Sequence, residues 1–174
     1  MSAGSGDFDL TTDELRAVAA FVVGSAEAVL PVFERAHPDD VRPRAALDAA
    51  RVFVAGAARS RLQRVTSLDA HRAAREATDE AARLAARACG DAASAAYLHP
   101  IARATQVGHV LRATASEARI AELLAGEAAA AEVLASASSR AGAVVRDVLS
   151  RYPAAPAGRS RVARLMSELD ASLR

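Results

Sequence analysis

Apolar residues recur along this chain at the three- to four-residue spacing of amphipathic helices, and they do not alternate as they would in strands. The first such segment begins at Thr11, where Glu14 completes a capping box, and its apolar positions continue toward Ala36. Pro31 lies inside this segment and is expected to kink the helix or to end it, with a short continuation to Ala36. The pattern predicts an all-α protein.

Turn residues divide the rest of the chain into further helical segments. These are expected at residues 43–55, 60–78, 79–97, 100–125, 127–151 and 162–173, with a stiff linker at 153–158. About seven helices joined by short turns imply an irregular bundle in a single domain, residues 11–174. Residues 1–10 are expected to form a disordered N-terminal tail.

Charge and cysteine content narrow the choice of partner and compartment. Arginine supplies all 22 basic side chains beside 21 acidic ones, and the two signs interleave, which is typical of solvated helix faces and predicts no nucleic-acid partner. The single Cys89 excludes an intrachain disulfide and fits the cytoplasm. The apolar run 17–26 is too short to span a bilayer, and residues 1–9 lack the basic start of a signal peptide, so no membrane contact is expected.

Polar side chains concentrate in the stretch 97–111, which is the main candidate for a functional site. If a helix starts at Pro100, then Arg103, Gln106 and His109 share about a third of its circumference, with His99 above them. The cluster can be a binding surface for an anion or a carboxylate, or a buried and internally satisfied group, or a catalytic site. No carboxylate stands at helical spacing to orient either histidine, so no catalytic residue is assigned.

A third histidine, His71, can join this cluster if its helix packs against the central one. A metal site formed by His71, His99 and His109 would then be conceivable. However, no two histidines show the spacing of helical metal sites, so neither a metal nor another cofactor is predicted. Cys89 is expected to be a small core residue, with a nucleophile as the less favoured interpretation.

The arginines outside this stretch are expected to be solvent-exposed. The helix expected from residue 60 begins with a solvated basic turn formed by Arg59, Arg61 and Arg64. The alternative is that these arginines contact phosphate. The next four are expected to make ordinary surface pairs with the acidic residues among which they stand: Arg72, Arg75, Arg83 and Arg87 with Glu76, Asp79 and Glu80.

Four segments of the chain, residues 36–50, 70–77, 95–111 and 148–158, resemble a family of small helical proteins described as immunity proteins of bacterial toxin systems. The stretch 95–111, with Tyr-Leu-His-Pro at 97–100, is the most specific of them. The resemblance implies a cytoplasmic protein that neutralises a cognate toxin by binding it, without catalysis. It carries no functional residue onto this chain.

Two other functions stay open at this point. One is a helical metal-binding protein or an enzyme that uses His71, His99 and His109. The other is a nuclease accessory factor, because genomes often label members of the family as an exonuclease subunit. A homodimer is also open, since the alanine-rich ridge of the segment 79–97 can be buried within the fold or between two copies.

Overall fold

The computed structural model describes residues 8–174, so most of the predicted N-terminal tail lies outside the described residues. Within this range the chain forms eight α-helices and one short 3₁₀ helix, which confirms the all-α prediction. In chain order they are α1 Thr12–Ala36, α2 Arg42–Val54, α3 Arg61–Glu76, α4 Glu80–Ser94, η1 Ala95–Tyr97, α5 Ala104–Ala125, α6 Glu127–Arg140, α7 Ala143–Ser150 and α8 Arg161–Leu173.

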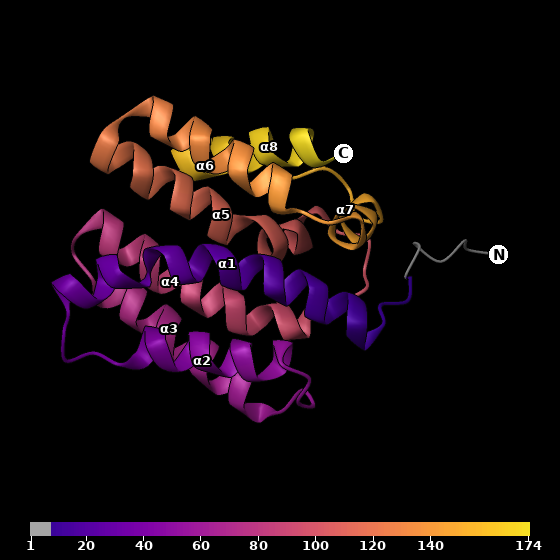
Figure 1. Cartoon of the computed structure of the whole chain (residues 1–174), viewed down its shortest axis with the longest axis horizontal. Helices are drawn as coiled ribbons and strands as arrows, with labels where there is room; N and C mark the ends of the chain where they lie inside the picture. Colours follow the sequence, from indigo (N-terminus) through magenta and orange to yellow (C-terminus); the bar gives the residue numbers. More distant parts are fainter. Residues whose placement is uncertain (1–7) are drawn as a thin grey trace.

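Helix α4 is the centre of the bundle and packs against α1, α2, α3 and α5 (Figure 1). Alanines make up most of its buried surface, and such small side chains let neighbouring helix axes approach closely. Figure 1 shows α1 crossing the middle of the molecule, with α2 and α3 below it and α5, α6 and α8 above. The alanine-rich ridge is therefore buried within the fold.

Helix α1 is apolar enough to line this centre along most of its length. Its 25 residues include an 18-residue window with a mean hydropathy of 1.6, so length and composition alone would let it cross a membrane. The shortness of the uninterrupted apolar run 17–26 therefore does not exclude a membrane span. In the fold, 56% of that window is buried, as expected for a core helix. The absence of membrane contact stays a prediction.

Side-chain caps begin several of the helices where the sequence places them. Thr11 and Glu14 form the predicted capping box, in which Glu14 N donates to Thr11 Oγ1 over 3.1 Å and Thr11 N donates to Glu14 Oε2 over 2.8 Å. Asp79 caps α4 by accepting a 2.7 Å hydrogen bond from Ala82 N. These local interactions are readable from sequence because both partners lie within one turn.

The predicted single helix at 127–151 is wrong, because it breaks into α6 and α7. Ala141 has an extended backbone with ψ 108°, and Gly142 precedes the first turn of α7. The Arg146 guanidinium donates to the carbonyl oxygens of Ser138 at 2.7 Å and Ala141 at 3.3 Å. It therefore satisfies acceptors at the end of α6 that a continuous helix would have bonded itself.

The central helix also starts later than Pro100, at Ala104. Two carbonyls of the preceding loop are bonded to distant parts of the chain: Phe8 N donates to Pro100 O at 3.2 Å, and the Tyr152 hydroxyl donates to His99 O at 2.8 Å. The Phe8 ring also meets the Tyr152 ring edge to face, with their centroids 4.8 Å apart. These tertiary contacts hold residues 98–103 outside the helix.

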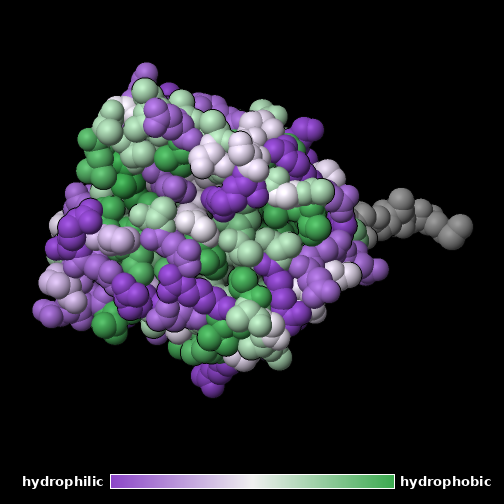
Figure 2. Space-filling model, viewed as in Figure 1, coloured by the Kyte–Doolittle hydropathy of each residue, from purple (hydrophilic) through white to green (hydrophobic). Residues whose placement is uncertain are grey.

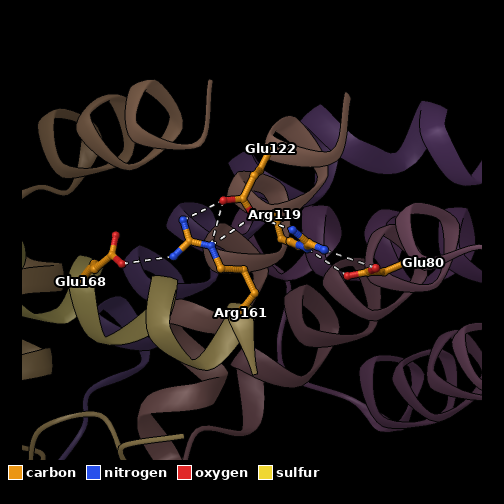
Figure 3. A network of polar contacts seen from close by, with 5 residues as sticks. All are labelled: Glu80, Arg119, Glu122, Arg161 and Glu168. Atoms are coloured by element: carbon orange, nitrogen blue, oxygen red, sulfur yellow. Dashed lines mark hydrogen bonds and ion pairs between the residues drawn. The ribbon is translucent and has the colours of Figure 1, made fainter. Parts of the chain in front are cut away.

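Five charged side chains fasten α8 to the rest of the bundle (Figure 3). Arg161 on α8 bonds Glu122 on α5 at 2.8 Å, and Arg119 bonds Glu80 on α4 at 3.0 Å. Arg119 also reaches Glu122 at 2.6 Å, while Glu168 pairs with Arg161 at 3.4 Å. The hydrogen bonds from Arg161 and Arg119 lower the pKa of Glu122 to about 2, so this carboxylate is ionised at neutral pH.

Hydrophobic and hydrophilic side chains interrupt one another over the face of the molecule seen in Figure 2. The largest exposed apolar side chains lie on several elements, and three of them, Leu62, Val65 and Leu68, share helix α3.

Candidate functional site

Three of the four histidines line one cavity of about 300 Å³ beside α3, which we call the histidine pocket. Its lining residues come from α3, the end of α4 with η1, the following loop and α5: Arg64, Ser67, Leu68, His71, Ser94, Tyr97, His99 and His109. The structure therefore brings His71 together with His99 and His109, which the sequence had left open, although α3 packs mainly against α4 and α2. Because the lining is contributed by four separate segments, its shape depends on the whole fold.

His71 lies flat against helix α4 at Gly90. A Cβ atom at position 90 would stand 2.9 Å from the His71 ring, so only glycine leaves room for this approach. Ser67, one turn before His71, donates its hydroxyl to Gly90 O at 2.8 Å and fixes the same contact. The close packing of α3 on α4 thereby sets the position of the imidazole.

Behind His71 lies a buried ion pair that the sequence did not reveal. Asp91 on α4 is fully buried, and Arg112 on α5 donates to both of its oxygens, at 2.9 and 2.5 Å. His71 Nε2 is 3.6 Å from Asp91 Oδ1. The hydrogen bonds to Asp91 raise the pKa of Arg112, and this bidentate pair joins α4 to α5 directly behind the pocket wall.

Burial keeps two of the pocket histidines neutral. It lowers the pKa of both His71 and His109, and the charge of Arg112 lowers them further while Asp91 opposes the shift. The Ser94 hydroxyl lies 3.3 Å from His109 Nδ1, within hydrogen-bond distance. His71 and His109 are therefore uncharged at neutral pH, and the positive charge in the lining of the pocket is that of Arg64.

The other two residues of the predicted polar cluster have different positions. Gln106 Oε1 accepts a 3.2 Å bond from His99 N, so this side chain holds the loop before α5. Arg103 is the exposed N-cap residue of α5 with an extended backbone, and it does not line the pocket. The expectation that Arg103 shares a helical face with Gln106 and His109 is wrong, because it assumed a helix starting at Pro100.

A second cavity, of about 400 Å³, adjoins the histidine pocket and shares Leu68 and His71 with it. We call it the arginine pocket, since four of its seven lining residues are arginines: Leu68, His71, Ala74, Arg75, Arg83, Arg87 and Arg112. Arg112 is bound to Asp91. The side chains of Arg75, Arg83 and Arg87 form no hydrogen bond or ion pair with any residue of the described range 8–174.

The predicted surface pairs of Arg75, Arg83 and Arg87 are therefore wrong. The acidic residues expected to pair with them are bonded elsewhere: Glu76 to Arg42 at 2.5 Å, Glu80 to Arg119 at 3.0 Å, and Asp79 to the backbone of Ala82. Only Arg72 makes a local pair, with Asp69 at 2.7 Å. Burial, and after it the nearby charge of Arg112, lower the pKa of Arg87.

The exposed face of α3 borders both pockets. Leu62, Val65 and Leu68, three residues apart, are 49%, 40% and 53% exposed, while the helix turns Gln63, Ser67 and its alanines inward. At the start of this face Arg59 and Arg64 stack on the Tyr97 ring, with their guanidinium carbons 5.0 and 4.9 Å from its centroid. The basic helix opening is thus partly fixed by an aromatic ring.

The sequence contained one unused signal for this site. Asp91 is the only acidic residue on the small-residue ridge of α4, and a charge on a buried ridge requires a partner. Cys89, on the same helix, is buried as predicted, and burial raises the pKa of its thiol to about 12. Residues 8–174 hold no group of three or more histidine, cysteine, aspartate or glutamate side chains arranged to bind a metal ion.

Comparison with known proteins gives one positive result. Neither the curated proteins nor the solved structures contain a match to this chain. The model of one family, described as "Imm-5 like putative immunity protein", matches residues 9–133, which include both pockets and all of helices α1 to α5. With most of its length matched, the chain belongs to the Imm-5 like immunity protein family.

Proposed function

We propose that this protein is an immunity protein that binds a cognate toxin and neutralises it without catalysis. The observation that carries the proposal is the family match over residues 9–133. The exposed α3 face with its two adjoining pockets supplies a surface on which such binding can occur. The protein acts in the cytoplasm in this proposal, and its partner is a protein.

A growth experiment tests the proposal. The product of the adjacent gene is expressed in a bacterial host alone and together with this chain. We expect the adjacent product to arrest growth and this chain to restore it. An adjacent product that is not toxic, or arrest that persists in the presence of the folded chain, counts against the immunity function.

Neutralisation by binding has a further signature in its stoichiometry. With purified components, inhibition should rise with the molar ratio of the two proteins and be complete near equal amounts. The toxin should regain activity, with unchanged mass, after the complex is separated in denaturant and the toxin refolded. A small catalytic amount of this chain that inactivates excess toxin would instead indicate an enzyme.

The metal-binding alternative has one observation in its favour, the shared pocket of His71, His99 and His109. Metal analysis of the purified protein tests it directly. Stoichiometric metal that is lost in His99→Ala or His109→Ala would replace the binding-only proposal with a metalloprotein.

A further inference from the structure

We propose that the exposed face of α3 and the adjoining arginine pocket form the toxin-binding surface, and that a carboxylate side chain of the toxin enters the arginine pocket. The proposal rests on the proposed immunity function. It commits to one kind of occupant, a folded protein whose surface carries Asp or Glu next to apolar side chains.

The charge of the pocket is the first argument. The side chains of Arg75, Arg83 and Arg87 make no hydrogen bond or ion pair among residues 8–174, and Asp91 behind the pocket has both oxygens bonded to Arg112. All three arginine side chains are exposed at the cavity, so an incoming carboxylate can accept charge-assisted hydrogen bonds from them. An acidic side chain is thus the complementary group for this pocket.

The apolar stripe is the second argument, because it determines the size of the occupant. Leu62, Val65 and Leu68 follow one another along α3, and Leu68 forms part of the wall of both pockets. A small anion would fill the arginine pocket and leave this stripe in water. A protein surface would cover the stripe and the pocket together, as the apolar centre and charged rim of an interface do.

The arrangement also suits fast association. The arginines lie beside the stripe at the C-terminal half of α3 and on α4, and the stripe begins next to the stacked pair Arg59 and Arg64. A positive surface attracts an acidic partner from solution and orients it before contact. The apolar side chains then determine how long the complex lasts.

The test measures the affinity of purified variants for the purified product of the adjacent gene by calorimetry. The double variant Arg83→Glu/Arg87→Glu reverses the pocket charge and should weaken binding by about 100-fold or more. Arg83→Gln/Arg87→Gln removes two of the three unpaired charges and should weaken binding by about tenfold. Leu68→Asp, on the stripe, should weaken it by about tenfold or more.

Matched controls carry the same chemical changes on another side of the molecule. Arg159→Glu/Arg164→Glu reverses two arginines at the start of α8, which Figure 1 places on the far side of α1 from α3. Leu124→Asp changes a leucine that is 68% exposed at the end of α5. Both controls should bind within about threefold of the original chain. Thermal unfolding by circular dichroism is recorded for every variant, so that only folded proteins enter the comparison.

Each outcome decides a separate question. If the original chain neither binds nor protects, the proposed function fails and this inference fails with it. If the original chain binds and the folded α3-face variants bind equally well, or if only the controls lose affinity, the inference fails while the function stands. Sedimentation adds the last case: a dimer that Leu68→Asp converts to monomers with unchanged toxin binding would assign this face to a second copy and overturn the proposal.

Discussion

Two arginine clusters of this protein differ in what surrounds them. At the junction of α4, α5 and α8, Arg119 and Arg161 are each bonded to carboxylates (Figure 3). In the arginine pocket, Arg75, Arg83 and Arg87 have no partner within residues 8–174. The first cluster is complete within the fold and fastens helices together. The second leaves three exposed arginine side chains without a partner in the fold, so they are available to a partner of opposite charge.

The largest expected effect concerns Asp91, the buried partner of Arg112 in the wall of the arginine pocket. Asp91→Ala should lower the free energy of unfolding by about 3 kcal/mol, because it leaves Arg112 unpaired beside a buried wall. This loss of free energy lies at the low end of the range expected for breaking a buried ion pair, since 32% of the Arg112 side chain is exposed to solvent. Urea unfolding measures it. Asp48→Ala, which removes an exposed partner of Arg51, is the control and should change stability by no more than about 0.5 kcal/mol. A loss for Asp91→Ala as small as the control's would show that the pair does not join α4 to α5 in solution.

A smaller effect is expected where His71 meets α4. Gly90→Ala places a Cβ atom 2.9 Å from the ring; we expect a steric cost of about 1–3 kcal/mol that alanine's helix preference partly offsets, leaving a net loss of about 1 kcal/mol. The loss should largely disappear in a His71→Ala background, which removes the ring. Gly108→Ala on α5, where a Cβ would meet Arg112 at 3.9 Å, is the matched control and should stabilise the protein. An equal loss from Gly90→Ala in both backgrounds would contradict this packing.

Replacing one arginine of each cluster by alanine tests the difference between the two clusters directly. Arg161→Ala should destabilise the protein by up to about 1 kcal/mol, because it breaks the bonds that fasten α8 to Glu122. Arg87→Ala should leave stability within about 0.5 kcal/mol or raise it, since no bond is lost and repulsion from Arg112 is relieved. Thermal unfolding of the two variants side by side measures the difference. If Arg87→Ala proves the more destabilising, the pocket arginines have a structural role and the contrast fails.

The smallest effect is a pH dependence that only the paired cluster should have. The pKa of Glu122 is lowered from its ordinary value to about 2, so its ionised form stabilises the fold above about pH 4.5, and this contribution is lost as the pH falls toward 2. Glu122→Gln should therefore reduce the drop in Tm between pH 5 and pH 2.5. Arg87→Ala, in the unpaired cluster, should leave that drop unchanged. An identical acid response of Glu122→Gln and the original chain would show that the network does not persist in solution.

Sequence reasoning predicted the parts of this fold that depend on neighbours in the chain. The capping box of Thr11 and Glu14 and the cap at Asp79 are complete within one turn, so their partners are visible in the sequence. The break between α6 and α7 could not be predicted in this way, because the partner that stabilises it, Arg146, lies on the following helix. The late start of α5 depends on Phe8 and Tyr152, which lie far away along the chain.

The candidate site was predicted only in part, because it too depends on contacts between residues far apart in the chain. The sequence left open that His71 meets the central histidines if its helix packs against theirs. They do meet, although α3 packs mainly against α4 and α2, and the arginine pocket was not predicted. Local spacing favoured pairs between Arg75 or Arg83 and their acidic neighbours, whereas Glu76 and Glu80 bond to Arg42 and Arg119, 34 and 39 residues away. Which arginines stay unpaired is a property of the tertiary structure alone.

The stacking of Arg59 and Arg64 on Tyr97 has a consequence for spectroscopy. The chain contains no tryptophan and only two tyrosines, and the other tyrosine, Tyr152, is buried against Phe8. Excitation selective for tryptophan would therefore detect only the tryptophans of a bound partner. The emission of Tyr97 would report on the rim of the histidine pocket. Both sides of the complex can thus be followed by fluorescence without attaching a dye.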